Sequence, residues 1–253
     1  MLLVLIAAST VPAADMRPVH HYRRTNSDGS EAEDIHVFVE APTRIAVMKE
    51  KSRCTNAAYV TARLDPATGQ ADWLVGGRLT RALAQEPFAQ LFSEDGGRRI
   101  VAQVNTGPRS TPLVEQLAAE PPWHIYDFDF ADMAARPPKA VGARRDFSFD
   151  LPLILSTDSG FEFGNRGRLH LKGATPVRHF GRPAIRYRAA GAAGNGTFWF
   201  DARSGVLLEA RLPLANHSEY RNFRLRLIRT TYGEARWKAK LADHWRGCPP
   251  SDG

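Results

Sequence analysis

Cysteine is scarce in this chain, with only two residues, Cys54 and Cys248, among 253. Neither belongs to a C-x-x-C motif, and the eight histidines include no H-E-x-x-H pair, so the sequence shows no recognisable metal-binding pattern. We therefore expect no metal ion and no cofactor. The two cysteines either form one disulfide, if the chain is exported, or stay as two separate thiols.

Long apolar runs are also missing. After residue 14 no segment approaches the roughly 20 apolar residues that a transmembrane helix needs, so we expect no transmembrane segment. Residues 1–14, MLLVLIAASTVPAA, combine an apolar run with a small-residue end, which is typical of a secretory signal peptide. This interpretation places the mature chain in the periplasm or outside the cell. The alternative is a buried first strand.

Nucleophile motifs are absent as well, because the sequence contains no G-x-S-x-G elbow and its histidines are scattered. One candidate pair remains, Asp127 and Asp129 in the tripeptide DFD. In a strand both carboxylates would point to the same face about 7 Å apart, where they could bind a divalent cation or act as acid and base in glycoside hydrolysis. The alternative is a solvated strand face. We therefore expect no catalytic residues and keep a hydrolase as an alternative.

Acidic residues are outnumbered, and the imbalance lies in the second half of the chain. Residues 144–253 hold 19 basic against 10 acidic side chains, whereas the first 143 residues hold 15 against 17. Alternation places Arg186 and Arg188 on one strand face and Arg224 and Arg226 on another, and aligned strands would form a positive wall. Because the arginines are not interleaved with exposed aromatic residues, we expect no nucleic-acid partner. An anionic envelope component, such as lipid head groups or a polymer, fits better, and an ordinary solvated face is the alternative.

What the sequence does contain is period-two alternation between turn residues, which indicates antiparallel strands. Residues 58–64 alternate in this way, and Pro42 divides residues 34–51 into two strands. A D-x-x-[ST]-G turn occurs twice, at residues 65–69 and 201–205, with an aspartate that can bind backbone N–H groups and a glycine that can take a positive φ.

Three segments have helical patterns: residues 78–92, residues 113–119 after a Thr-Pro start, and residues 234–246 with apolar residues every four positions. The predicted fold is mainly β, with one or two curved antiparallel sheets or a half-barrel and two or three packing helices. We expect a single domain over residues 15–253, with the alternative of two similar β halves that meet near residues 135–145, where proline, glycine and charge accumulate.

Residues 180–227 carry a resemblance to a known family. They place strands before and after the hairpin that contains Trp199-Phe200-Asp201-Ala202-Arg203-Ser204-Gly205. This order resembles periplasmic proteins with a LolA/LolB-like half-barrel, and it is similar to related uncharacterised periplasmic domain families. The resemblance implies a strongly bent antiparallel sheet around a helical lid, with an apolar cavity for lipid or acyl chains.

The leading functional hypothesis is an exported, non-catalytic protein that binds a hydrophobic or amphiphilic ligand in envelope lipid handling. A structural or interaction protein of the envelope that uses open sheet edges is the alternative, ahead of the hydrolase. The expected ligand-lining residues are aromatic: Phe198, Phe200, Tyr126, Phe128 and Phe130.

Overall fold

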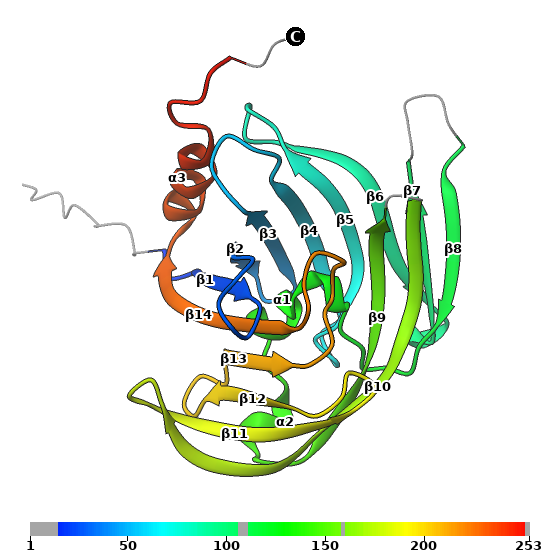
Figure 1. Ribbon diagram of the computed structural model, residues 1–253, viewed down its shortest axis with the longest axis vertical. Helices are drawn as coiled ribbons and strands as arrows, with labels where there is room; N and C mark the ends of the chain where they lie inside the picture. Colours follow the sequence, from blue (N-terminus) through cyan, green and yellow to red (C-terminus); the bar gives the residue numbers. More distant parts are fainter. Residues whose placement is uncertain (1–14, 106–110, 158–159, 251–253) are drawn as a thin grey trace, which may run out of the picture.

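A single antiparallel sheet forms most of the molecule. The computed structural model describes residues 15–105, 111–157 and 160–250, so the predicted signal peptide at residues 1–14 lies outside the described residues. Within these ranges fourteen strands join in the order β8-β7-β6-β5-β4-β3-β2-β1-β14-β13-β12-β11-β10-β9, and Figure 1 shows them curling into a nearly closed barrel. The prediction of a mainly β fold with a curved antiparallel sheet is confirmed.

The strands follow one another along the chain, with one long connection, between β8 and β9, among the described residues. They are β1 (Pro18–Thr25), β2 (Glu33–Ala41), β3 (Arg44–Glu50), β4 (Ala58–Leu64), β5 (Ala71–Leu79), β6 (Gln85–Glu94), β7 (Arg99–Val104), β8 (Leu113–Ala118), β9 (Phe147–Thr157), β10 (Gly160–His179), β11 (Arg182–Gly191), β12 (Gly196–Asp201), β13 (Leu207–Leu212) and β14 (Phe223–Tyr232).

Two sets of contacts connect the half of the sheet formed by β1 to β8 with the half formed by β9 to β14. The first strand, β1, pairs with the last, β14, so that the two halves of the chain belong to one sheet. At the two ends of the sheet, β8 approaches β9 and β10 through side chains: the Asn165 amide of β10 donates to the Ala118 carbonyl oxygen of β8 (3.2 Å), and the Glu120 N–H after β8 donates to an Asp150 carboxylate oxygen of β9 (2.9 Å). A seam of side-chain hydrogen bonds therefore takes the place of a strand ladder between β8 and β9.

The segment between β8 and β9 turns into the barrel and fills it. It contains the short helices η2 (Tyr126–Phe128), α1 (Ala131–Ala135) and α2 (Lys139–Gly142), and Figure 1 shows α1 within the ring of strands. Trp123 in this segment is fully buried, and its indole N–H donates to the Gly97 carbonyl oxygen (2.8 Å). The inward faces of the strands thus bury their apolar side chains against an internal plug.

The third helix, α3 (Glu234–Trp245), packs on the outside of the barrel, as its amphipathic pattern predicts. Trp237 stacks on Phe38 of β2 with ring centroids 5.7 Å apart. Glu50 of β3 holds the end of the helix, because it contacts His244 (2.5 Å) and also pairs with Lys240. The disulfide Cys54–Cys248 then ties the segment after α3 to the β3–β4 connection, so that of the two alternatives left open by the sequence the structure shows the paired one.

Helices predicted over residues 78–92 and 113–119 are wrong, because these residues form β5, β6 and β8. The leucines of residues 78–92 pack on two different faces of the sheet. Leu79 packs outward in the cluster under α3, whereas Leu91 packs inward in the main core. Between them, Leu83 takes a positive φ of 59° in the hairpin. Apolar spacing alone could not separate one helical face from two strands that face opposite ways.

Both D-x-x-[ST]-G segments form the expected turns. The Asp65 carboxylate accepts hydrogen bonds from the Ala67 and Thr68 N–H groups (2.9 and 2.7 Å). The Asp201 carboxylate accepts from the Arg203 and Ser204 N–H groups (both 2.9 Å). Each turn closes at a glycine with a positive φ, 80° and 74°, a conformation that favours glycine.

Candidate functional site

The DFD tripeptide lies in a turn of the plug, so the expectation of a strand here is wrong. Tyr126–Phe128 form the 3₁₀ turn η2, and Asp129 and Phe130 follow with positive φ values of 54° and 55°. The turn sends the two carboxylates to different partners. Asp127 accepts a hydrogen bond from the Ile154 N–H of β9 (3.2 Å), whereas Asp129 points into a buried cluster of cations.

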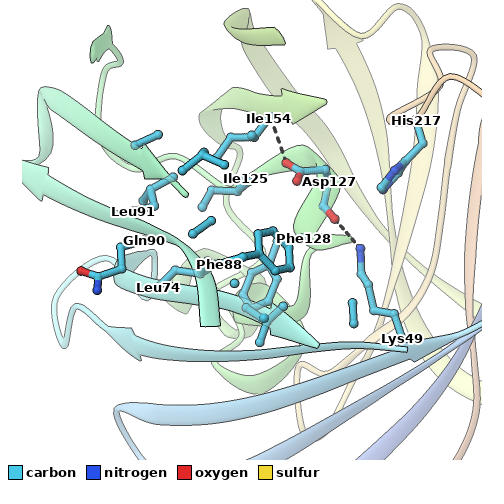
Figure 2. A pocket seen from close by; sticks show the side chains of 17 residues that line it. Lys49, Leu74, Phe88, Gln90, Leu91, Ile125, Asp127, Phe128, Ile154 and His217 are labelled. Atoms are coloured by element: carbon cyan, nitrogen blue, oxygen red, sulfur yellow. Dashed lines mark hydrogen bonds between the residues drawn. The ribbon is translucent and has the colours of Figure 1, made fainter. Parts of the chain in front are cut away.

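Beside this turn, the barrel interior contains a pocket of about 220 Å³ between the plug and the strands β3 to β7. Figure 2 shows its apolar side chains, among them Leu74, Leu91 and Phe128, to the left of Asp127, and Lys49 and His217 to the right. The full lining is Lys49, Ala58, Val60, Leu74, Gly76, Gly77, Phe88, Ala89, Gln90, Leu91, Ala102, Val104, Ile125, Asp127, Phe128, Ile154 and His217. The pocket is thus mostly apolar, with three ionisable side chains at one end.

Lys49 organises this polar end. Its ammonium group donates to the backbone carbonyl oxygen of Asp127 (2.5 Å) and forms an ion pair with the Asp129 carboxylate (2.5 Å). Burial opposes the charge of Lys49, but the carboxylates of Asp129 and Glu33 outweigh it and keep the pKa of Lys49 above its usual value. Lys49 therefore stays charged inside the barrel.

The pKa values of the other two groups of the polar end are shifted toward their neutral forms. Burial raises the pKa of Asp127 to about 6, although Lys49 opposes this shift. Burial and the charge of Lys49 lower the pKa of His217 to about 4. Within the residues that the structure describes, the Nε2 atom of His217 is buried and has no hydrogen-bond partner. An uncharged imidazole nitrogen is therefore left to interact with whatever occupies the pocket.

Behind the pocket, Asp129 belongs to a fully buried network. The Arg24 guanidinium lies 3.3 Å from the Asp129 carboxylate and 3.2 Å from the centre of the Tyr220 ring. The Asn216 amide donates to the Asp129 carboxylate (2.8 Å) and to the Tyr126 carbonyl oxygen (2.7 Å). Burial disfavours the ionised carboxylate, but Lys49 and Arg24 outweigh it and hold the pKa of Asp129 below its usual value. Asp129 therefore anchors the plug to β1 and β3.

Of the five aromatic residues expected to line a ligand cavity, Phe128 lines this pocket. The others pack together in the core: the Phe130 ring lies 5.3 Å from that of Phe198 and 5.7 Å from that of Tyr126. Phe198 and Phe200 are fully buried and stack on each other. A ligand contact by these four residues stays a prediction.

Lys49 and Arg24 were not singled out from the sequence, although one of them carries a signal. Alternation along residues 45–49 places Lys49 on the same face as Ile45 and Val47, both of which are fully buried. A lysine on the apolar face of a strand indicates either a buried ion pair or a functional group. Its partner Asp129 is 80 residues away, so only the fold reveals the pair.

The described residues include no helix that is long and apolar enough to cross a membrane. Over the same ranges, no three or more His, Cys, Asp or Glu side chains gather in a way that could hold a metal ion. Scanned against models of known protein families, the chain matches none, and no curated protein is significantly similar to it. The site itself therefore carries the functional argument.

Proposed function

We propose that this protein is an exported, non-catalytic binding protein that holds a small hydrophobic or amphiphilic ligand in the interior pocket. The observation that carries the proposal is an apolar pocket inside the barrel with Lys49, Asp127 and His217 gathered at one end. Mostly apolar concave sites with a few convergent polar groups are the usual form of small-molecule sites.

The size of the pocket limits the ligand. Its volume of about 220 Å³ lies above the roughly 150 Å³ of a cavity that accommodates benzene and below the roughly 300 Å³ at which drug-sized sites begin. A short alkyl chain, or one or two rings, therefore fits better than a full-length acyl chain.

The charges at the polar end favour an uncharged head group. Lys49 is already paired with Asp129, so an ionic head group would be buried without a counter-ion of its own. A hydroxyl group, by contrast, can donate to the neutral imidazole of His217 and, below about pH 6, accept from the protonated Asp127. The preferred ligand is accordingly a short aliphatic or aromatic alcohol, or an amphiphile with a comparable uncharged end.

Isothermal titration calorimetry with octanol, octanoate and octylamine tests this proposal at a matched chain length. At about pH 5, where Asp127 is mostly protonated, we expect binding of octanol and at least about tenfold weaker binding of the two ions, because each buries an unpaired charge. Equal affinity for all three would contradict the head-group assignment, and binding of none would contradict the ligand site. Native mass spectrometry of the chain isolated from a periplasmic extract would then identify a resident ligand.

A pocket-filling variant ties binding to this site. Val60 lines the pocket, and the neighbouring Tyr59 packs on the opposite face of β4 under α3. We expect Val60→Phe to weaken octanol binding at least about tenfold by occupying the space, and the control Tyr59→Phe to leave it unchanged. Unchanged binding by Val60→Phe would place the ligand elsewhere.

Export of the chain is part of the proposal and is supported by the disulfide. A pairing of Cys54 with Cys248 persists in oxidising compartments and is rare in the cytosol. N-terminal sequencing of the secreted chain tests it: we expect the mature protein to begin near residue 15, and an intact Met1 would contradict the predicted signal peptide.

Acid catalysis by Asp127 is a second candidate function. Its raised pKa, about 6, keeps part of this carboxyl group protonated near neutral pH, as a general acid requires. Asp129 is held by Lys49 and Arg24, and Asp127 is the one carboxylate in the pocket lining. Hydrolysis of a chromogenic glycoside that Asp127→Asn abolishes would support this function, and no turnover by the unaltered protein would remove it.

A further inference from the structure

The convex face of β10 to β14 carries the arginine stripes predicted from the sequence, and strand pairing aligns them. Arg186, Trp199, Glu209 and Arg226 lie opposite one another across β11 to β14. The next row contains Lys172, Arg188, Thr197, Arg211 and Arg224. The residues between these positions, such as Tyr187, Phe198 and Leu225, are buried in the barrel core, so both rows face outward.

One acidic side chain stands among these six cations, and it neutralises only part of their charge. Glu209 is fully buried beneath the rows and accepts hydrogen bonds from Arg211 (2.7 Å) and Arg224 (2.8 Å). Among the described residues, no carboxylate forms an ion pair with Lys172, Arg186, Arg188 or Arg226. The face therefore keeps unbalanced positive charge, and an anionic partner would meet it.

An exposed aromatic residue lies at the edge of this face, on the hairpin between β10 and β11. Phe180 is 51% exposed, although its ring lies 3.6 Å below the guanidinium of Arg226. The imidazole of His179 lies 4.2 Å from the Phe180 ring and 4.5 Å from the Trp199 ring. Figure 1 shows this hairpin projecting at the lower left, beyond the neighbouring strands. A half-exposed aromatic ring thus lies among the cations of this face.

We propose that the convex face of β10 to β14, with Phe180 at its tip, docks onto a lipid surface that carries anionic phosphate head groups. Arginine matches phosphate oxygens with two parallel hydrogen bonds, and Phe side chains beside a basic surface can enter the boundary between head groups and acyl chains. A soluble polyanion would explain the arginines but would leave the exposed half of the Phe180 ring uncovered. This docking does not rest on the proposed pocket ligand, because the pocket lies on the β3 to β7 side of the barrel.

Vesicle flotation tests the docking directly. The protein is mixed with vesicles of phosphatidylcholine alone or of phosphatidylcholine with phosphatidylglycerol. We expect flotation only with the anionic vesicles, and a marked decline in high salt, because salt screens charge at an exposed surface. Equal flotation with both vesicles, or with neither, would overturn the proposal. Binding to soluble polyphosphate without vesicle binding would also overturn it and would indicate a polymer partner.

Matched variants locate the contact. Arg186→Gln with Arg188→Gln removes two exposed cations from the face, and Arg98→Gln with Arg99→Gln removes two from the distant start of β7. We expect the first pair of substitutions to weaken vesicle binding about tenfold or more and the second pair to have little effect. A basic residue adds to the binding free energy only when it lies close to the anionic lipid surface. Equal effects of the two pairs of substitutions would show that the vesicles respond to the net charge of the protein and not to this face.

A second pair of variants tests the aromatic tip. Phe180 and Val114 of β8 are both about half exposed, at 51% and 50%. We expect Phe180→Ser to weaken binding several-fold at constant charge, whereas Val114→Ser should leave it unchanged. An unaffected Phe180→Ser variant would contradict insertion of the hairpin. Circular dichroism of all variants establishes that the fold is retained.

Discussion

Asp127 and Asp129 are two residues apart, yet their surroundings push their ionisation in opposite directions. Asp129 faces Lys49 and Arg24, whereas the Asp127 carboxylate accepts a backbone N–H at the edge of an apolar pocket. The difference arises because η2 turns the backbone between them. The local surroundings therefore make Asp129 a structural carboxylate and leave the Asp127 carboxyl group available to a ligand.

We predict that Asp127→Asn changes the pH dependence of stability. The pKa of Asp127 rises from 3.8 to about 6 on folding, so the native state holds its proton longer than the unfolded chain and loses stability as pH rises through this window. Asparagine keeps the acceptor for the Ile154 N–H and does not ionise.

Relative to the unaltered protein, the Asp127→Asn variant should gain about 3 kcal/mol between about pH 3 and about pH 8. Urea unfolding across this range measures the gain, with Asp95→Asn in an exposed turn as the control. A stability difference that stays constant with pH would show that Asp127 does not carry a raised pKa.

Arg24 and Arg23 are adjacent on β1 and provide a matched pair for a second prediction. Arg24 is fully buried against Asp129, whereas the Arg23 side chain is 53% exposed and pairs with Asp34. We expect Arg24→Met to cost about 3–5 kcal/mol of unfolding free energy because it leaves buried polar groups without a partner. Arg23→Met should cost about 1 kcal/mol or less. Similar costs in urea unfolding would contradict a buried ionic network.

At the scale of elements, the plug is held by turns that belong to the sheet. The hairpin between β12 and β13 ends at Gly205, where an added Cβ would lie 3.0 Å from the Cβ of Pro137 in the plug. Gly69, which ends the other D-x-x-[ST]-G turn, is as close to the plug, with 3.3 Å to the Arg136 carbonyl oxygen. The two similar turns therefore clamp adjacent plug residues from opposite halves of the sheet.

This arrangement predicts different costs for two glycine substitutions. Gly205 and Gly29 both have a positive φ, 74° and 89°, but an added Cβ at Gly29 has no neighbour within 4 Å. We expect Gly29→Ala to cost about 1 kcal/mol through the backbone alone and Gly205→Ala to cost at least about 1 kcal/mol more by displacing Pro137. Chemical denaturation of both variants measures this difference, and equal costs would contradict the clamp.

Considered as a whole, the molecule is closed by contacts between residues far apart in sequence. The pairing of β1 with β14 joins the two ends of the chain into one sheet, and α3 covers the outside of the strands next to this junction. The disulfide spans 194 residues and secures the segment after α3. A disulfide that closes a long loop lowers the conformational entropy of the unfolded chain more than that of the native state, and so stabilises the native state.

We predict that removal of this disulfide lowers the stability of the whole molecule. In the chain-entropy treatment a loop of this length contributes about 5 kcal/mol. The double variant Cys54→Ser with Cys248→Ser should unfold at a correspondingly lower urea concentration, and reductant should shift the unaltered protein but not the variant. A shift confined to hydrogen exchange in α3 would show that the disulfide acts locally instead.

The antiparallel strands, the two aspartate turns and α3 could be predicted, because alternation and turn chemistry are properties of neighbouring residues. The cysteine count alone left the pairing of Cys54 with Cys248 open. The strands at residues 78–92 could not be predicted, since Leu79 and Leu91 pack in two cores that exist only once the sheet and α3 have formed. Tertiary structure also decided the candidate site. Lys49, Asp127 and His217 come from β3, the plug and a late loop, and they meet only because the barrel closes around the plug.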